Sequence, residues 1–289
     1  LNETYTGSEL RERFGVERFT KELEINYKYV PEEEWNKTFG GSDWDEAKSV
    51  QQTTDGGFIL AGYTYSYSYD AGDSDFWLVK TDANGNKVWD KTFGGSVSEC
   101  AYSVQQTADG GFIIAGLTTS YGAGDSDFWL VKTDANGNKE WDKTFGGSVS
   151  ERAYSVQQTA DGGYIIAGYT YSYDTGDSDF WLVKTDSDGN KVWDKTFGGS
   201  DWDRAYSVQQ TADSGYIIAG YTYSYGAGDC DFWLVKTDSD GNKVWDKTFG
   251  GSGFDLAESV QQTADGGYII AGLTDSYGAG SSDFWLVKV

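Results

Sequence analysis

The sequence contains no histidine or methionine, and only one proline and two cysteines among its 289 residues. The absence of histidine excludes imidazole metal ligands, Ser-His-Asp triads and imidazole proton shuttles. Cys100 and Cys230 occupy different positions of the internal repeat described below, so a disulfide framework is not expected. No apolar run reaches 18 residues, so the sequence predicts no membrane-spanning helix.

Basic residues are also scarce. The 22 Lys and Arg stand against 46 Asp and Glu, which gives a formal net charge of −24. Nucleic-acid backbones are bound by clustered Lys and Arg, so a nucleic-acid partner is not expected. The chain begins at Leu1 instead of Met, as it would after removal of a secretion signal, and we expect an extracellular or cell-surface location.

A 52-residue internal repeat organises most of the chain. Its most regular block is DFWLVKTDANGNKEWDKTFGGS, residues 127–148. The apolar run at its start predicts a strand covered on both faces, and Asn-Gly predicts a hairpin turn before the returning strand. The DFWLVK part recurs at Asp75, Asp127, Asp179, Asp231 and Asp283.

Each repeat contains four strand patterns: SVQQT, a YIIAGYT-type run, DFWLVK and WDKTF. Four antiparallel strands per repeat of this length are typical of a β-propeller blade. We therefore predict an all-β fold, a five-bladed β-propeller over residues 35–289. In that architecture the SVQQT strand lines the central channel and the WDKTF strand lies outermost.

Residues 35–39 have the sequence of an outermost strand, although no blade precedes them. Residues 283–289 form a third-strand pattern that no fourth strand follows. The N-terminal strand 35–39 is therefore predicted to complete the last blade and close the ring, which removes an exposed sheet edge. The alternative is that residues 35–39 complete a blade of a neighbouring molecule and build a polymer.

Residues 1–34 match no repeat and are assigned as an N-terminal extension. A short helix is predicted over residues 8–21 and an amphipathic strand over residues 22–30. Such a strand can cover its own propeller or add to the sheet edge of another copy, which would build a filament. The candidate assembly residues are Leu23, Ile25, Tyr27 and Tyr29.

The three recurring blocks, W[ND]KTFGGS, SVQQTxDGGYIIAG and DFWLVKTDxxGN, resemble those of exported archaeal and bacterial β-propeller repeats. The segment from Asp186 to Trp193 is also similar to the tryptophan-docking motif of quinoprotein propellers. That resemblance implies that the tryptophan locks one blade onto the next, and it implies no quinone cofactor. The tryptophans concerned are Trp89, Trp141, Trp193 and Trp245.

The loops before the first strand and between the second and third strands share one face of a propeller and concentrate Asp and aromatic residues. Exposed aromatic rings beside carboxylates can stack on sugars and accept their hydroxyl hydrogens. The alternative is that the rings wedge between blades. The candidate ligand-binding residues are Trp44, Trp202, Phe254, Tyr67, Tyr173 and Tyr225.

An acidic residue precedes the first strand of every blade. Carboxylates are suitable ligands for Ca²⁺, the one cofactor that the sequence suggests. The alternative is that these short side chains cap loop amides. The candidate calcium ligands are Asp45, Glu99, Glu151, Asp203 and Asp255, and the sequons at Asn2 and Asn36 are candidate glycosylation sites.

These features predict a structural or adhesion module of the cell surface that is not an enzyme. It would assemble with itself, as a filament or surface layer, through the N-terminal extension. The alternative function is a lectin-like propeller that binds surface glycans through its acidic and aromatic loops. A glycosidase is expected less, because it needs two carboxylates in different environments and here the acids recur in every repeat.

Overall fold

The computed structural model describes residues 34–69, 72–172 and 177–289 of the chain. The chain divides into two units, residues 1–36 and 37–289, and all the strands described below lie in the second. The described residues contain no helix, and therefore none that could cross a membrane. This confirms the predicted all-β class for that part, whereas the helix and strand predicted over residues 8–30 lie outside it.

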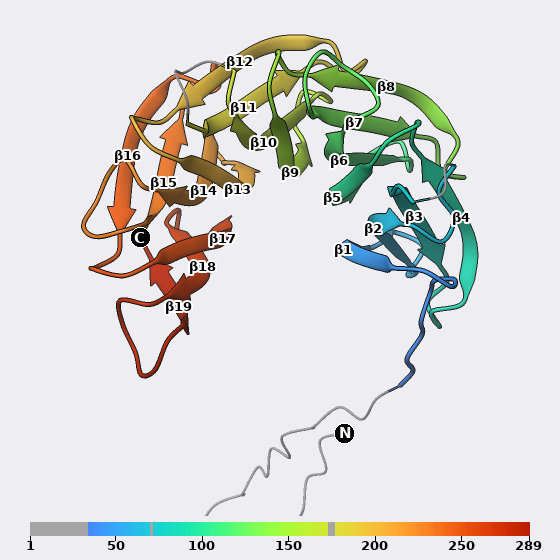
Figure 1. Ribbon diagram of the computed structural model, residues 1–289, viewed down its shortest axis with the longest axis horizontal. Helices are drawn as coiled ribbons and strands as arrows, with labels where there is room; N and C mark the ends of the chain where they lie inside the picture. The colour runs from blue at the N-terminus through green and yellow to red at the C-terminus, as the bar shows by residue number, and fades with distance from the viewer. Residues whose placement is uncertain (1–33, 70–71, 173–176) are drawn as a thin grey trace, which may run out of the picture. The chain divides into compact units, whose positions relative to one another are not determined.

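The strands form five antiparallel sheets that follow one another along the chain (Figure 1). The first sheet contains β1 (Asp45–Gln52), β2 (Phe58–Thr64), β3 (Asp75–Thr81) and β4 (Lys87–Phe93). The second contains β5 (Glu99–Gln106), β6 (Phe112–Thr118), β7 (Asp127–Thr133) and β8 (Lys139–Phe145). The third contains β9 (Glu151–Gln158), β10 (Tyr164–Thr170), β11 (Asp179–Thr185) and β12 (Lys191–Phe197). The fourth contains β13 (Asp203–Gln210), β14 (Tyr216–Thr222), β15 (Asp231–Thr237) and β16 (Lys243–Phe249), and the fifth contains β17 (Asp255–Gln262), β18 (Tyr268–Thr274) and β19 (Asp283–Lys288).

The hairpin between the third and fourth strands of a sheet forms as its sequence predicts. Gly137 has a φ of 76°, which an L side chain rarely adopts. One carboxylate oxygen of Asp134 accepts hydrogen bonds from the backbone N–H groups of Asn136 and Asn138, both at 2.8 Å. The Asp and the Gly together therefore fix the turn and the register of the returning strand.

Consecutive sheets pack face to face, and each pair encloses its own apolar core. Between the third and fourth sheets, Phe180 and Leu182 of the third sheet meet Ile218 and Trp233 of the fourth. The Phe180 and Trp233 ring centroids are 4.6 Å apart. We call the face that supplies the phenylalanine the outgoing face of a sheet, and the face that supplies the tryptophan the incoming face. The same outgoing and incoming positions build the other three cores.

The tryptophan of each fourth strand lies against the next sheet. Trp141 in β8 makes an edge contact with Tyr164 at the start of β10, with ring centroids 5.8 Å apart. A Cβ atom on Gly189, in the hairpin turn of the third sheet, would lie 2.6 Å from the Trp141 ring. The locking role expected from the tryptophan-docking resemblance is therefore confirmed, with equivalent contacts at Trp89, Trp193 and Trp245.

The paired glutamines of the first strands connect the sheets by hydrogen bonds. The Gln157 side-chain oxygen accepts from the backbone N–H of Gln210 at 2.6 Å, and the Gln210 side-chain oxygen accepts from Ala160 N–H at 2.9 Å. The Ser155 hydroxyl accepts from Val208 N–H at 3.2 Å. This Ser and Gln ladder recurs at every interface between consecutive sheets. First strands of all five sheets also line one hollow of about 380 Å³, as predicted for a central channel.

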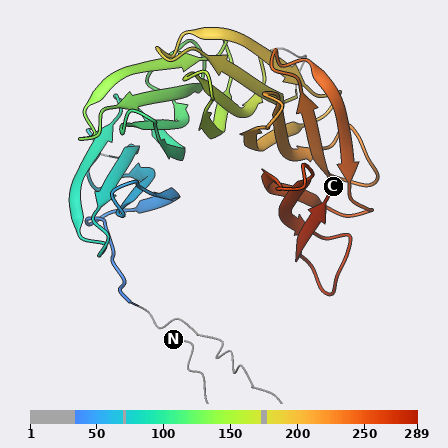
Figure 2. The same cartoon turned by 180° about the vertical axis from the view of Figure 1, so that it is seen from behind.

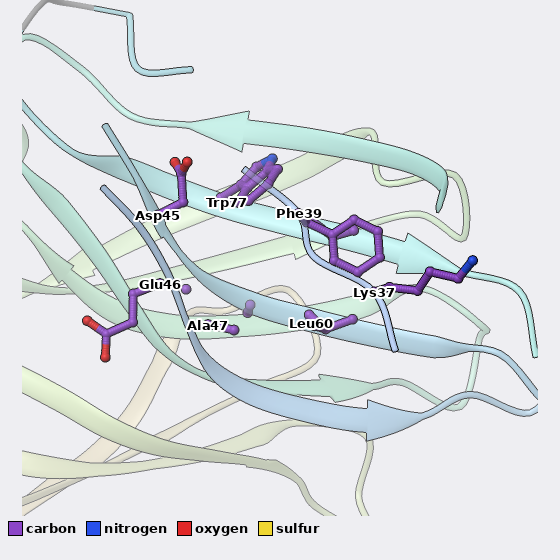
Figure 3. Close-up of a pocket in the computed structure, with 10 residues that line it drawn as sticks. Lys37, Phe39, Asp45, Glu46, Ala47, Leu60 and Trp77 are labelled. Atoms are coloured by element: carbon purple, nitrogen blue, oxygen red, sulfur yellow. The ribbon is translucent and has the colours of Figure 1, made fainter. Parts of the chain in front are cut away.

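The predicted closure by residues 35–39 is not present in the structure. The fifth sheet has three strands, and no strand is assigned to residues 34–41. Lys37 and Phe39 line a pocket with Leu60 and Trp77 of the first sheet instead (Figure 3). Figures 1 and 2 show β1 and β19 at opposite ends of the row of sheets. Phe284 of the fifth sheet is 103% exposed and Val50 of the first is 65% exposed, so these two sheets do not cover each other.

Candidate functional site

The acidic residue that opens each first strand lies beneath the loops of its own sheet. Glu99 is fully buried. Its carboxylate accepts hydrogen bonds from the Thr118 hydroxyl and from the backbone N–H of Gly95, both at 2.8 Å. Equivalent Thr, Ser or Gly donors surround the other four acids, which are Asp45, Glu151, Asp203 and Asp255.

These contacts are the loop-capping arrangement that the sequence offered as the alternative to calcium binding. No group of three or more acidic or cysteine side chains that could hold a metal occurs in the described part of the chain. Burial raises the pKa of Asp203 and of Glu151, and the nearby charge of Asp127 adds to the rise at Glu151. Calcium binding therefore gains no support from the described residues.

The loop tyrosines are partly exposed to solvent and also contact neighbouring residues. Tyr67 is 45% exposed, but its hydroxyl donates to the Gly40 carbonyl at 2.9 Å and its ring lies 5.4 Å from that of Trp77. Tyr225 repeats this arrangement, with Gly198 as its acceptor. Both tyrosines connect a loop to a strand end through the hydroxyl, and their rings pack on a tryptophan of their own sheet.

The three aromatic residues at the start of the first-strand loop differ in exposure. Trp44 is 65% exposed and Trp202 is 47% exposed. Phe254 is half-buried, packing with Tyr221 and the buried thiol of Cys230. The three residues occupy equivalent positions of the repeat, but of the three only the two tryptophans are largely exposed to solvent in the structure.

Trp202 lies in a cleft of about 340 Å³ on the loop face of the fourth sheet. Asp201 and Tyr223 line the same cleft, and the rings of Trp202 and Tyr223 meet edge to face at a centroid distance of 6.0 Å. Asp229 comes from the following loop, and Asp177 comes from the third sheet. An aromatic surface thus faces three carboxylates contributed by two neighbouring sheets.

Arg204 supports this cleft from beneath. Its guanidinium donates to the Tyr171 hydroxyl at 2.8 Å and to the Ser178 hydroxyl at 3.2 Å. It also lies 4.4 Å from the ring centroid of Tyr169 and 5.9 Å from that of Trp202. These contacts hold the guanidinium beside the Trp202 ring, where a cation is attracted to the ring face.

The second sheet shows why the cleft depends on tryptophan. Ser98 replaces Trp202 there, and its hydroxyl donates at 3.3 Å to Asp73, the counterpart of Asp177. Sequence reasoning selected Trp202 but missed Asp201 and Tyr223 as its companions. The signal was the Asp-Trp-Asp triplet at residues 201–203, which recurs only at residues 43–45.

Several other candidate residues lie outside the described part of the chain: Tyr173, Leu23, Ile25, Tyr27, Tyr29 and Asn2. Asn36 is exposed, as a glycosylated asparagine must be. Its glycosylation stays a prediction.

No known protein family and no curated protein matches the chain. Among solved structures, a "putative exo-beta-1,3-galactanase" from Bifidobacterium bifidum s17 is similar at a TM-score of 0.45 and 13% identity, over 83% of this chain and 86% of that chain. The S511A mutant of puromycin hydrolase is similar at a TM-score of 0.49 and 14% identity, over 79% of this chain and 36% of that chain. A protein of unknown function from Bacteroides caccae is similar at a TM-score of 0.41 and 10% identity, over 68% of this chain, which spans 61% of its length.

The sequence-based exclusion of catalysis is withdrawn, because its premise fails in the structure; two of the similar structures are also named as enzymes. The exclusion assumed that near-identical repeats provide near-identical sites. The structure shows that they do not, since Asp73 meets a serine hydroxyl and Asp177 lines an open cleft beside Trp202. Repeat symmetry is therefore no ground for excluding an enzyme.

Proposed function

We propose that the protein is an extracellular adhesion module that binds carbohydrate in the Trp202 cleft. The observation that carries this proposal is the exposed indole of Trp202 among Asp177, Asp201 and Asp229. A sugar ring stacks on an indole through its C–H face, and carboxylates accept hydrogen bonds from its hydroxyl groups.

The charge of the protein narrows the ligand class. Three carboxylates line the cleft, and the whole chain carries a formal net charge of −24. An anionic sugar would be repelled by this field, whereas a neutral sugar or an amino sugar would not. We therefore propose neutral hexoses or amino sugars of surface glycans as the ligands.

The proposed function includes a complete architecture for the repeats. The five repeats act as blades of a propeller-type scaffold of the exported repeat family that the sequence resembles. Residues 35–39 have the sequence of the other outermost strands, and they supply the fourth strand of the fifth blade of a neighbouring copy. This scaffold holds the loops rigidly enough to present a preformed cleft.

The test is a glycan array followed by calorimetric titration of the best neutral or amino sugar. Trp202→Ala should raise the Kd at least about tenfold, since aromatic anchors supply much of the energy of small binding sites. Trp44→Ala is the matched control: Trp44 has the same repeat position, but the described part of the chain has no sheet before the first to supply a counterpart of Asp177.

The proposal fails if the array shows no binding, or if the two variants lower the affinity equally. Near-UV circular dichroism of both variants should match that of the wild type, so that lost binding can be assigned to the cleft.

A further inference from the structure

The outgoing face of the fifth sheet has the sequence of an interface but no neighbouring sheet among the residues that the structure describes. Phe284 is 103% exposed and Leu286 is 66% exposed. Their counterparts in the fourth sheet, Phe232 and Leu234, are each 1% exposed. Two large apolar side chains that are core residues in other repeats thus face solvent here.

The incoming face of the first sheet is uncovered in the same way. Val50 is 65% exposed, whereas its counterpart Val104 is 6% exposed. A cavity of about 180 Å³ opens on this face, lined by Leu60, Gly62 and Trp77 among others (Figure 3).

The cavity corresponds to the place where a phenylalanine sits at an internal interface. Phe76 of the first sheet lies over Gly116 of the second, so closely that a Cβ atom on this glycine would be 2.8 Å from the ring. Phe76 also contacts Trp129 at a centroid distance of 4.6 Å. Gly62 and Trp77 are the counterparts of Gly116 and Trp129, so the cavity has the lining that receives Phe76 in the second sheet.

The polar groups of the two faces are complementary as well. At internal interfaces the Ser and Gln of one first strand accept hydrogen bonds from backbone N–H groups of the next. The fifth sheet carries the corresponding acceptors on Ser259 and Gln261, and the first sheet carries the corresponding donors at Val50 and Gln52.

Residues 37–39 lie beside the incoming face of the first sheet, where the fourth strand of a preceding sheet would lie. Phe39 is the counterpart of Phe93, which lies in β4 and packs against the core between the first and second sheets. Lys37 and Phe39 line the cavity of the first sheet. β19, in turn, lacks a fourth strand within the described fifth sheet.

We propose that the fifth sheet of one copy docks on the first sheet of a second copy of this chain, with Phe284 seated against Gly62 and Trp77. Residues 35–39 of the second copy then pair with β19 as its fourth strand. A second copy is the occupant because the interface it forms is already present four times within one chain. The fifth sheet of the same chain does not cover the first, since Phe284 and Val50 are both exposed. The contact is head-to-tail, so it continues until a ring closes or a filament forms.

The test uses two full-length variants that each block one face: Phe284→Lys on the fifth sheet and Leu60→Lys on the first. Sedimentation velocity should show concentration-dependent association of the wild type and monomers of each variant, with the Kd raised more than about 100-fold by the buried lysine. An equimolar mixture should form a heterodimer, because Leu60→Lys keeps an intact fifth sheet and Phe284→Lys keeps an intact first sheet.

Val192→Lys is the control, since Val192 is 60% exposed in a sheet with neighbours on both sides, lies on neither end face, and its variant should associate like the wild type. A wild type that stays monomeric at high concentration would overturn the proposal, and so would a mixture that stays monomeric. Continued association of both single variants would assign self-association to another surface and would also overturn it. Thermal melts of each variant confirm that loss of association is not loss of folding.

Discussion

The internal interfaces and the two end faces are made from the same amino acids in different surroundings. Phe232 is 1% exposed in the fourth sheet, and Phe284 is 103% exposed at the equivalent position of the fifth. The local sequences, DFWLVK in both cases, are identical. Burial in this fold is therefore decided by the neighbouring sheet and not by the repeat itself, as expected when each repeat contacts only its neighbours.

The largest difference in stability between an internal interface and an end face should appear when the phenylalanine of the outgoing face is replaced by alanine. Phe180→Ala empties a closed core and should lower the free energy of unfolding by about 3–5 kcal/mol. Phe284→Ala should change it by less than about 0.5 kcal/mol in dilute protein, because the ring is already in water. Urea denaturation of both variants measures the two effects, and similar losses would contradict the comparison.

A smaller difference is expected for the Ser and Gln ladder. Gln157→Ala removes the acceptor of the 2.6 Å bond from Gln210 N–H and should cost about 1 kcal/mol. Gln261→Ala alters the same repeat position where no next sheet follows in the described chain, so its effect should be close to zero. Hydrogen exchange of the Gln210 amide provides a local readout, and unchanged protection in Gln157→Ala would argue against the ladder.

The smallest difference in stability between internal sheets and the fifth sheet should come from the ion pairs. In these pairs a lysine contacts the aspartate of the Asp-Gly-Gly or Asp-Ser-Gly turn. A hydrogen bond from Thr211 and the Lys236 ammonium lower the pKa of Asp213 to about 2. The folded carboxylate thus ionises at lower pH than the unfolded one, so its stabilisation is present above about pH 4 and is lost as pH falls toward 2. Solvent screening keeps this contribution small, because the Asp213 side chain is 65% exposed.

Melting temperatures at pH 7, 4 and 2.5 test this ion-pair effect. Asp213→Asn should lower the melting temperature at pH 7 and flatten its fall below pH 4. Asp265→Asn in the fifth sheet should do so less, because its partner Lys288 is 45% exposed whereas Lys236 is 6% exposed. Equal flattening in the two variants would show that the neighbouring sheet does not influence these pairs.

Local structure could be predicted from the sequence because its causes are local. The Asn-Gly turn at residues 136–137 demands a positive φ, and the repeated patterns predict the strands β1 to β19. The docking role of Trp141 likewise followed from its position in a short motif. In each case the residues that determine the outcome lie within one repeat or two consecutive repeats.

Closure and the Trp202 cleft could not be predicted in the same way. Closure depends on the rotation between sheets, which accumulates over four interfaces and is not encoded by any single motif. The cleft depends on which residues of two sheets meet, so Trp44 and Trp202 have the same sequence context but different surroundings. A pattern along one chain segment does not contain that information.

The Ser and Gln ladder has a consequence for how such a chain evolves. Because Gln105, Gln157 and Gln209 each meet an identical backbone partner in the next sheet, the ladder can form between any two repeats. Unequal recombination between the repeated coding segments would therefore add or remove a whole sheet and leave the ladder intact. The number of repeats becomes a heritable variable, while the single substitutions that create a binding cleft persist in whichever repeat carries them.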